Sequence, residues 1–109
     1  MKKRYKIRAI ARGHYNQFLS SGENSYVKTH PLQAHFATLV NEPKKQYLHA
    51  EIATLLKAGI DKVRSLRIIN ESTMLGDSEP CKVCRKAIQA FGVKKIIYYK
   101  DSKLVIEKL

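Results

Sequence analysis

The sequence predicts an α/β fold: a single three-layer domain, with helices on the faces of a mixed five-stranded sheet. Its 109 residues suffice for one hydrophobic core and are too few for two domains. Strand-like and helix-like segments alternate in the order strand, strand, helix, helix, strand, helix, strand, strand. We therefore expect residues 1–109 to form one domain, with the last two strands as an antiparallel hairpin.

The first half of the sheet is expected at the start of the chain. Residues 5–12 alternate between apolar and basic side chains, which predicts a strand with one buried face. Residues 13–16 are typical of a turn, residues 17–21 of a returning strand, and residues 22–25 of a loop that leaves the sheet. The apolar face of the first strand comprises Tyr5, Ile7, Ala9 and Ala11.

Three helices follow from apolar spacing and end signals. The first covers residues 31–40, with Pro31 in its first turn. The second runs from His49 to Ala58, and the third begins near Cys81 and ends by Gly92. In the first helix the expected apolar stripe is Leu32, Phe36, Leu39 and Val40.

The remaining strands are residues 63–69, 96–99 and 104–106, which are rich in aliphatic and aromatic side chains. The last two are joined by residues 100–103, a connection too short for a crossover, so they should pair antiparallel. A helix that connects two parallel strands begins beside the end of the first strand, and ligand-binding sites form at such strand ends. The starts of the second and third helices are therefore expected at one edge of the sheet.

The chain is strongly basic, with 21 lysines and arginines against 9 acidic residues and a net charge of +12. Such a surplus favours polyanionic partners through phosphate neutralisation, although a solubilising surface is the alternative. No apolar run approaches the ~18–20 residues of a membrane span, so no membrane partner is expected. Arg8 and Arg12 interrupt the first apolar stretch and argue against a signal peptide, which predicts a cytoplasmic location.

Both cysteines lie in the segment Pro80-Cys81-Lys82-Val83-Cys84, and a His49-Ala50-Glu51 triplet precedes it. Three residues apart at a helix start, Cys81 and Cys84 should face the same side, where the helix dipole favours thiolates. Taken alone, the cysteines could instead be half of a closed structural zinc site completed by His30 or His35. Glu51 alone could be a solvated first-turn acid.

Together, H-x-E and P-C-x-x-C form the signature of zinc nucleobase deaminases, and residues 49–98 resemble the cytidine/deoxycytidylate deaminase superfamily. The resemblance implies one Zn²⁺ per chain, held by His49, Cys81 and Cys84 with one position open for a water of lowered pKa. It also implies that Glu51 moves protons and that the reaction is hydrolytic deamination, with cytosine favoured over adenine or guanine. In a regular helix His49 and Glu51 would point about 200° apart, so we expect His49 at the helix cap.

The same resemblance extends to substrate contacts. Gly22-Glu23-Asn24 is similar to a loop of the family whose asparagine contacts the substrate sugar, which assigns that role to Asn24; a simple turn is the alternative. Tyr26 could stack on a base or pack at the loop edge. Ala50, between the two motif residues, is also expected to contact the substrate. Lys44 and Lys45 could meet a phosphate or form a solvated charged pair.

Two features of the sequence indicate different substrate classes. A histidine at position 49 is typical of relatives acting on deoxycytidylate, tRNA adenosine, guanine or single-stranded polynucleotides, whereas the final hairpin is typical of free-nucleoside deaminases. The proposed substrate is a nucleotide such as deoxycytidine monophosphate, or single-stranded nucleic acid. The alternative function is a basic nucleic-acid-binding module in which zinc has only a structural role. Such a module would not need Glu51.

The superfamily's usual helix before the first strand is missing from this sequence. Either the helix at residues 31–40 or another subunit should cover the sheet face that this leaves bare, because an exposed apolar face is a liability. A homo-oligomer is therefore expected.

Overall fold

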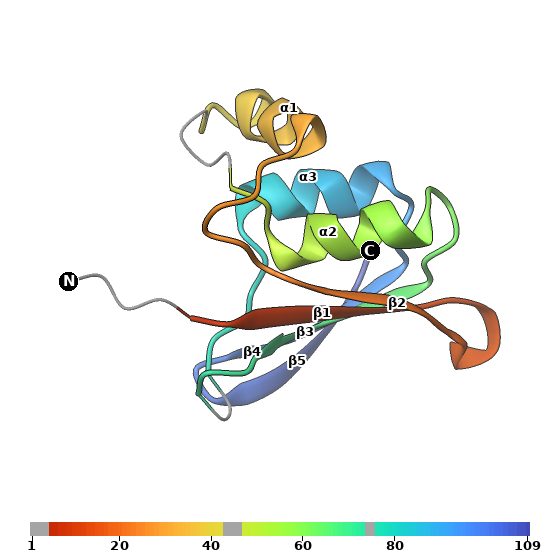
Figure 1. Ribbon diagram of the computed structural model, residues 1–109. Coiled ribbons are helices and arrows are strands. Elements are labelled where there is room, and N and C mark those ends of the chain that lie inside the picture. Colours follow the sequence, from red (N-terminus) through yellow and green to blue (C-terminus); the bar gives the residue numbers. More distant parts are fainter. Residues whose placement is uncertain (1–4, 43–46, 74–75) are drawn as a thin grey trace.

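The computed structural model describes residues 5–42, 47–73 and 76–109, which form a five-stranded mixed sheet and three α-helices (Figure 1). The strand order is β2-β1-β3-β4-β5, and β3 and β4 run parallel while the other neighbouring pairs are antiparallel. The α/β class, the mixed sheet and the final hairpin are confirmed. The strands are β1 (Ile7–Arg12), β2 (Phe18–Glu23), β3 (Ser65–Asn70), β4 (Lys95–Lys100) and β5 (Lys103–Lys108). The helices are α1 (Pro31–Leu39), α2 (Ala50–Ala58) and α3 (Lys82–Ala90), and a 3-10 turn, η1 (His14–Asn16), joins β1 to β2.

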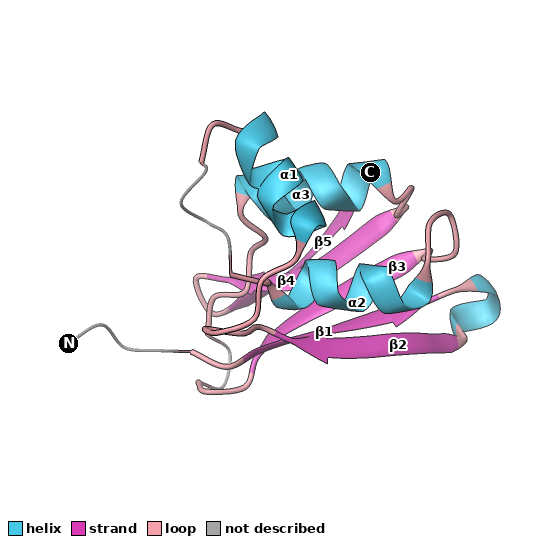
Figure 2. Ribbon diagram, turned by 45° about the horizontal axis from the view of Figure 1, so that its top comes forward, coloured by secondary structure: helices cyan, strands magenta, loops and turns pink. Residues whose placement is uncertain are grey.

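All three α-helices lie on one side of the sheet (Figures 1 and 2). Helix α2 packs on β1 and β2, α3 lies beside α2, and α1 packs against α3. The layers are therefore the sheet, then α2 with α3, then α1 outermost. The helix expected at residues 31–40 does not cover the second sheet face, because its buried side meets α3. Among the described residues, no helix is both long and apolar enough to cross a membrane.

Small side chains let α2 lie close to the sheet. Ala9 of β1 is fully buried, and the Thr54 hydroxyl of α2 donates to its carbonyl oxygen at 3.2 Å. A Cβ atom at Gly22 of β2 would lie 2.8 Å from the Thr54 Oγ1, so only glycine fits at that position. This close contact fixes α2 on the sheet, and with it the position of the helix start.

The end of β2 differs from the expectation. Gly22 and Glu23 were expected in a loop, but they belong to the strand and pair with Ala9 and Arg8 of β1. The Arg8 guanidinium donates to the Glu23 carboxylate, and this pairing overrides the local turn preference of the sequence. The loop that leaves the sheet therefore starts at Asn24.

The buried side of α1 also differs from the predicted stripe. Leu39 is 58% exposed, whereas Gln33, Phe36 and Ala37 are buried. The helix is therefore rotated toward a polar residue, Gln33, that helical spacing of apolar residues could not select.

Candidate active site

The two helices that carry the motif begin with extended cap residues. His49 is the N-cap of α2, with φ −82° and ψ 154°, and Cys81 is the N-cap of α3, with φ −73° and ψ 173°. An extended cap changes the direction of the His49 side chain relative to the helix, so His49 and Glu51 both line one pocket. The expected position of His49 at the cap is confirmed.

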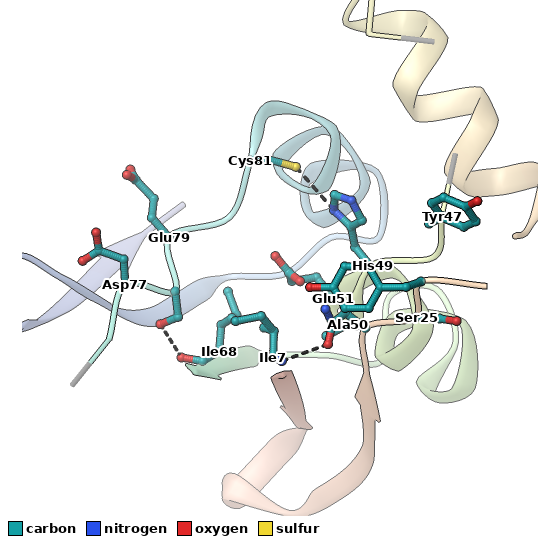
Figure 3. A pocket seen from close by; sticks show the side chains of 13 residues that line it. Ile7, Ser25, Tyr47, His49, Ala50, Glu51, Ile68, Asp77, Glu79 and Cys81 are labelled. Atoms are coloured by element: carbon teal, nitrogen blue, oxygen red, sulfur yellow. Dashed lines mark hydrogen bonds between the residues drawn. The ribbon is translucent and has the colours of Figure 1, made fainter. Parts of the chain in front are cut away.

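The predicted ligand atoms lie together. The Nδ1 atom of His49 is 3.2 Å from the Sγ atom of Cys84. It is 3.5 Å from the Sγ atom of Cys81, which lies beside the His49 ring (Figure 3). Tetrahedral zinc with bonds of about 2.0–2.3 Å separates neighbouring ligand atoms by about 3.3–3.8 Å. The two nitrogen–sulfur distances are close to this range. Two sulfurs and one imidazole nitrogen are also the donors that zinc prefers.

The alternative of a closed structural site requires a fourth protein ligand. In the part of the chain that the structure describes, His49, Cys81 and Cys84 form the group of possible metal ligands, with all ligand atoms within 4.8 Å of one another and no fourth member. His30 instead caps α1, its Nδ1 accepting from the Leu32 amide at 3.1 Å. His35 is exposed and packs edge-on against Phe36. The arrangement is that of a three-ligand site, which is the catalytic type.

The two cysteines differ in protonation. A hydrogen bond with Cys84 lowers the pKa of Cys81 to about 3, and the same bond together with burial raises the pKa of Cys84 well above its usual value. Without metal, the pair therefore holds one proton between its sulfurs. Metal binding needs both thiolates and must release that proton.

Glu51 lies in the first turn of α2 and is 6% exposed. Burial raises the pKa of its carboxyl group, while its own backbone hydrogen bond and the nearby His49 act in the opposite direction. The side chain lines the pocket and is outside the ligand group (Figure 3). A buried carboxyl group beside a metal site, with its pKa raised by burial, is suited to accept and return a proton.

The pocket has a volume of about 430 Å³, within the range of small-molecule sites. Its described lining contains no lysine or arginine, whereas Asp77 and Glu79 lie at one side (Figure 3). Lys44 and Lys45, for which a phosphate contact and a solvated charged pair were both open, are outside the described residues. The described lining is Ile7, Asn24, Ser25, Tyr26, Tyr47, His49, Ala50, Glu51, Ile68, Asp77, Ser78, Glu79 and Cys81.

The structure places Asn24, Tyr26 and Ala50 in this lining. The Asn24 Oδ1 accepts from the Ile7 amide at 2.9 Å, and its Nδ2 donates to the Tyr5 carbonyl at 3.0 Å. The Tyr26 hydroxyl donates to the same carbonyl at 2.9 Å. These bonds hold the start of β1 at the rim of the pocket, and a contact of the three residues with substrate remains a prediction.

Two positioning residues were missed from the sequence. Gln33 is fully buried, and its Oε1 accepts from the His49 amide at 3.1 Å, so α1 fixes the ligand's backbone. Ser78 donates to the Ile68 carbonyl at 2.8 Å and accepts from the Tyr99 amide at 2.9 Å, which ties the segment before Cys81 to β3 and β4. Neither residue gives a local signal in the sequence, because Gln33 is polar and the partners of Ser78 lie on β3 and β4.

Replacing Gln33 with alanine is expected to lower zinc affinity by about 10- to 100-fold, the usual cost of losing a group that orients a ligand. Competition with a chromogenic chelator measures this affinity. Thr38→Ala, an exposed position on the same helix, is the control and should leave the affinity unchanged. Equal affinities for Gln33→Ala and the natural chain would show that α1 does not position His49.

Comparison with known proteins adds one match. The family model of the cytidine and deoxycytidylate deaminase zinc-binding region matches residues 3–100. This span contains both helix starts and every described residue of the pocket. A search of curated proteins finds no match.

Proposed function

Because this chain belongs to the cytidine and deoxycytidylate deaminase family, we propose that it hydrolyses the amino group from cytosine in a zinc-dependent reaction. The observation that supports the proposal is that the ligand group His49, Cys81 and Cys84 lies at the pocket that the buried Glu51 also lines. A zinc-stapled binding module without activity would account for the three ligands, and it would leave the buried carboxyl without a role.

Zinc held by the three ligands would supply the lowered water pKa that makes attack on the ring possible near neutral pH. Glu51 takes one proton from the attacking water and delivers it to the ring nitrogen. It then takes the second proton from the hydroxyl now bound to the ring carbon and gives it to the leaving amino group. The new bond joins the water oxygen to the amine-bearing ring carbon, and the carbon–nitrogen bond breaks. The products are uracil in place of cytosine and one molecule of ammonia.

The proposed substrate is a nucleotide such as deoxycytidine monophosphate, or cytosine in single-stranded nucleic acid. His49 in the ligand position and the net charge of +12 support this class. Asn24 would contact the sugar, Tyr26 would stack on the base, and Ala50 would line the base pocket. We also propose a homo-oligomer, supported by Leu104 and Ile106 of β5, which are 49% and 57% exposed.

Ammonia release tests the proposal directly. The zinc-loaded chain is offered cytidine, deoxycytidine monophosphate, and single-stranded DNA and RNA that contain cytosine, with adenine substrates as the comparison. We expect turnover of at least one cytosine substrate in excess of any adenine substrate. Release of ammonia from none of them would contradict an enzymatic function.

A further inference from the structure

The end of the sheet opposite the pocket carries a basic hollow of about 590 Å³. It lies where β1 ends and where β3 and β4 begin, so the length of the strands separates it from Glu51. Its described lining contains no acidic side chain; it consists of Gly13, His14, Tyr15, Asn16, Arg64, Ser65, Lys94 and Lys95.

Strand pairing extends this charge across the open face of the sheet. Arg12, Ser65, Lys95 and Lys108 are successive partners on β1, β3, β4 and β5 and therefore form one row on one face. The neighbouring row on that face contains Ile10, Arg67, Ile97 and Ile106. No described helix covers this face (Figure 2). Lys95 lies directly opposite Lys108, a like-charge pair that disfavours folding and that an anionic ligand would relieve.

The basic residues at this end differ from those elsewhere in the structure in their ion pairing. Elsewhere in the structure, Arg8 pairs with Glu23 and Glu71, and Arg85 of α3 pairs with Glu79 and Glu107. In the described part of the chain, by contrast, no carboxylate pairs with Arg64, Lys94 or Lys95. The backbone amides of Lys94 and Lys95 each donate to the Arg64 carbonyl oxygen at 3.1 Å. These hydrogen bonds hold the three basic residues next to one another.

Aromatic rings adjoin the charges. Tyr15 is fully exposed in η1, and both Tyr15 and Asn16 have positive φ values, 56° and 59°, which non-glycine residues rarely adopt. Phe18 is 55% exposed and is the strand partner of Arg12, where the register of β1 and β2 shifts. The Nη2 atom of Arg64 donates to the Nε2 atom of His14 at 2.8 Å, which holds the guanidinium beside the turn.

We propose that this far-end surface, comprising Arg12, Tyr15, Arg64, Lys94, Lys95 and Lys108, binds single-stranded nucleic acid. The cations contact successive phosphates, and the Tyr15 ring stacks on an unpaired base. Like-charge repulsion disfavours a second copy of this chain on these cations, because the row would face itself. The proposed oligomer would instead meet at Leu104 and Ile106 of β5, beside this row. A free single strand is favoured over a duplex because stacking needs bases whose faces are accessible. The inference does not depend on deaminase activity.

Fluorescence anisotropy with a short labelled single-stranded oligonucleotide tests the phosphate contacts. The double variant Lys94→Gln with Lys95→Gln is expected to bind about tenfold or more weakly at low salt. Its slope of log affinity against log salt should be smaller by about 0.7 for each lost phosphate contact. The matched control changes the same charge on α3, Lys82→Gln with Lys86→Gln, and should bind within about twofold of the natural chain.

Tyr15→Ala tests the stacking contact and should weaken single-strand binding by about tenfold while leaving duplex binding unchanged. Thermal unfolding and deamination of free cytidine by each variant establish that the fold and the pocket are intact. The proposal would be overturned if the two lysine double variants lost oligonucleotide affinity equally. It would also be overturned if the natural chain did not bind at low salt, or if Glu51→Gln lost binding. If the natural chain deaminates none of the cytosine substrates while the binding differences persist, this surface is established and the deaminase proposal alone is rejected.

Discussion

Replacing Glu51 with glutamine is expected to lower the rate of ammonia release by about 10²–10⁴-fold, the contribution of a positioned acid–base group. The amide has nearly the same size and cannot take a proton from water. Because Glu51 lies outside the ligand group, zinc content should remain at one per chain. Steady-state kinetics on the best cytosine substrate, together with metal analysis, measures both quantities.

The control for this variant is Glu71→Gln, which removes an exposed carboxylate that pairs with Arg8. Its activity should match that of the natural chain. Activity retained in Glu51→Gln would contradict the assigned proton transfer. Loss of zinc along with activity would instead make Glu51 part of the metal site.

Replacing Cys84 with serine is expected to abolish stoichiometric zinc binding and to lower the melting temperature. The Cys84 side chain is fully buried, and a serine hydroxyl is a poor zinc ligand. Zinc at a hundred times its dissociation constant stabilises a fold by about 2.7 kcal/mol, which corresponds to roughly 10 °C in a domain of this size.

Metal analysis and thermal unfolding with and without a chelator measure this effect. The natural chain should lose its zinc-dependent increase in melting temperature when the chelator is added, and Cys84→Ser should show none under either condition. A variant that keeps one zinc per chain would show that Cys84 is not a ligand.

Local sequence patterns predicted much of the fold and the position of the His49 ligand at a helix cap. The alternation around Ala9 and Ala11 predicted which face of β1 is buried, and both residues are fully buried. The requirement that His49 and Glu51 reach one pocket predicted a cap at His49, which the backbone angles of that residue confirm. These features depend on neighbours in the sequence, so the sequence alone could predict them.

The remainder depends on contacts between distant segments. Gly22 looks like a turn residue until β1 pairs with it, and Gln33 looks like a surface residue until the His49 amide meets it. The open sheet face follows from the docking of α1 on α3, and the basic row follows from strand register. No local periodicity encodes either arrangement.

X-ray absorption at the zinc edge tests the central claim, that three side chains hold zinc and leave one position open. The account predicts two sulfur atoms at about 2.3 Å, one imidazole nitrogen at about 2.0 Å and one further light atom that is not from imidazole. A second imidazole in the shell would show a closed structural site and contradict the account, as would purified chain that binds no zinc.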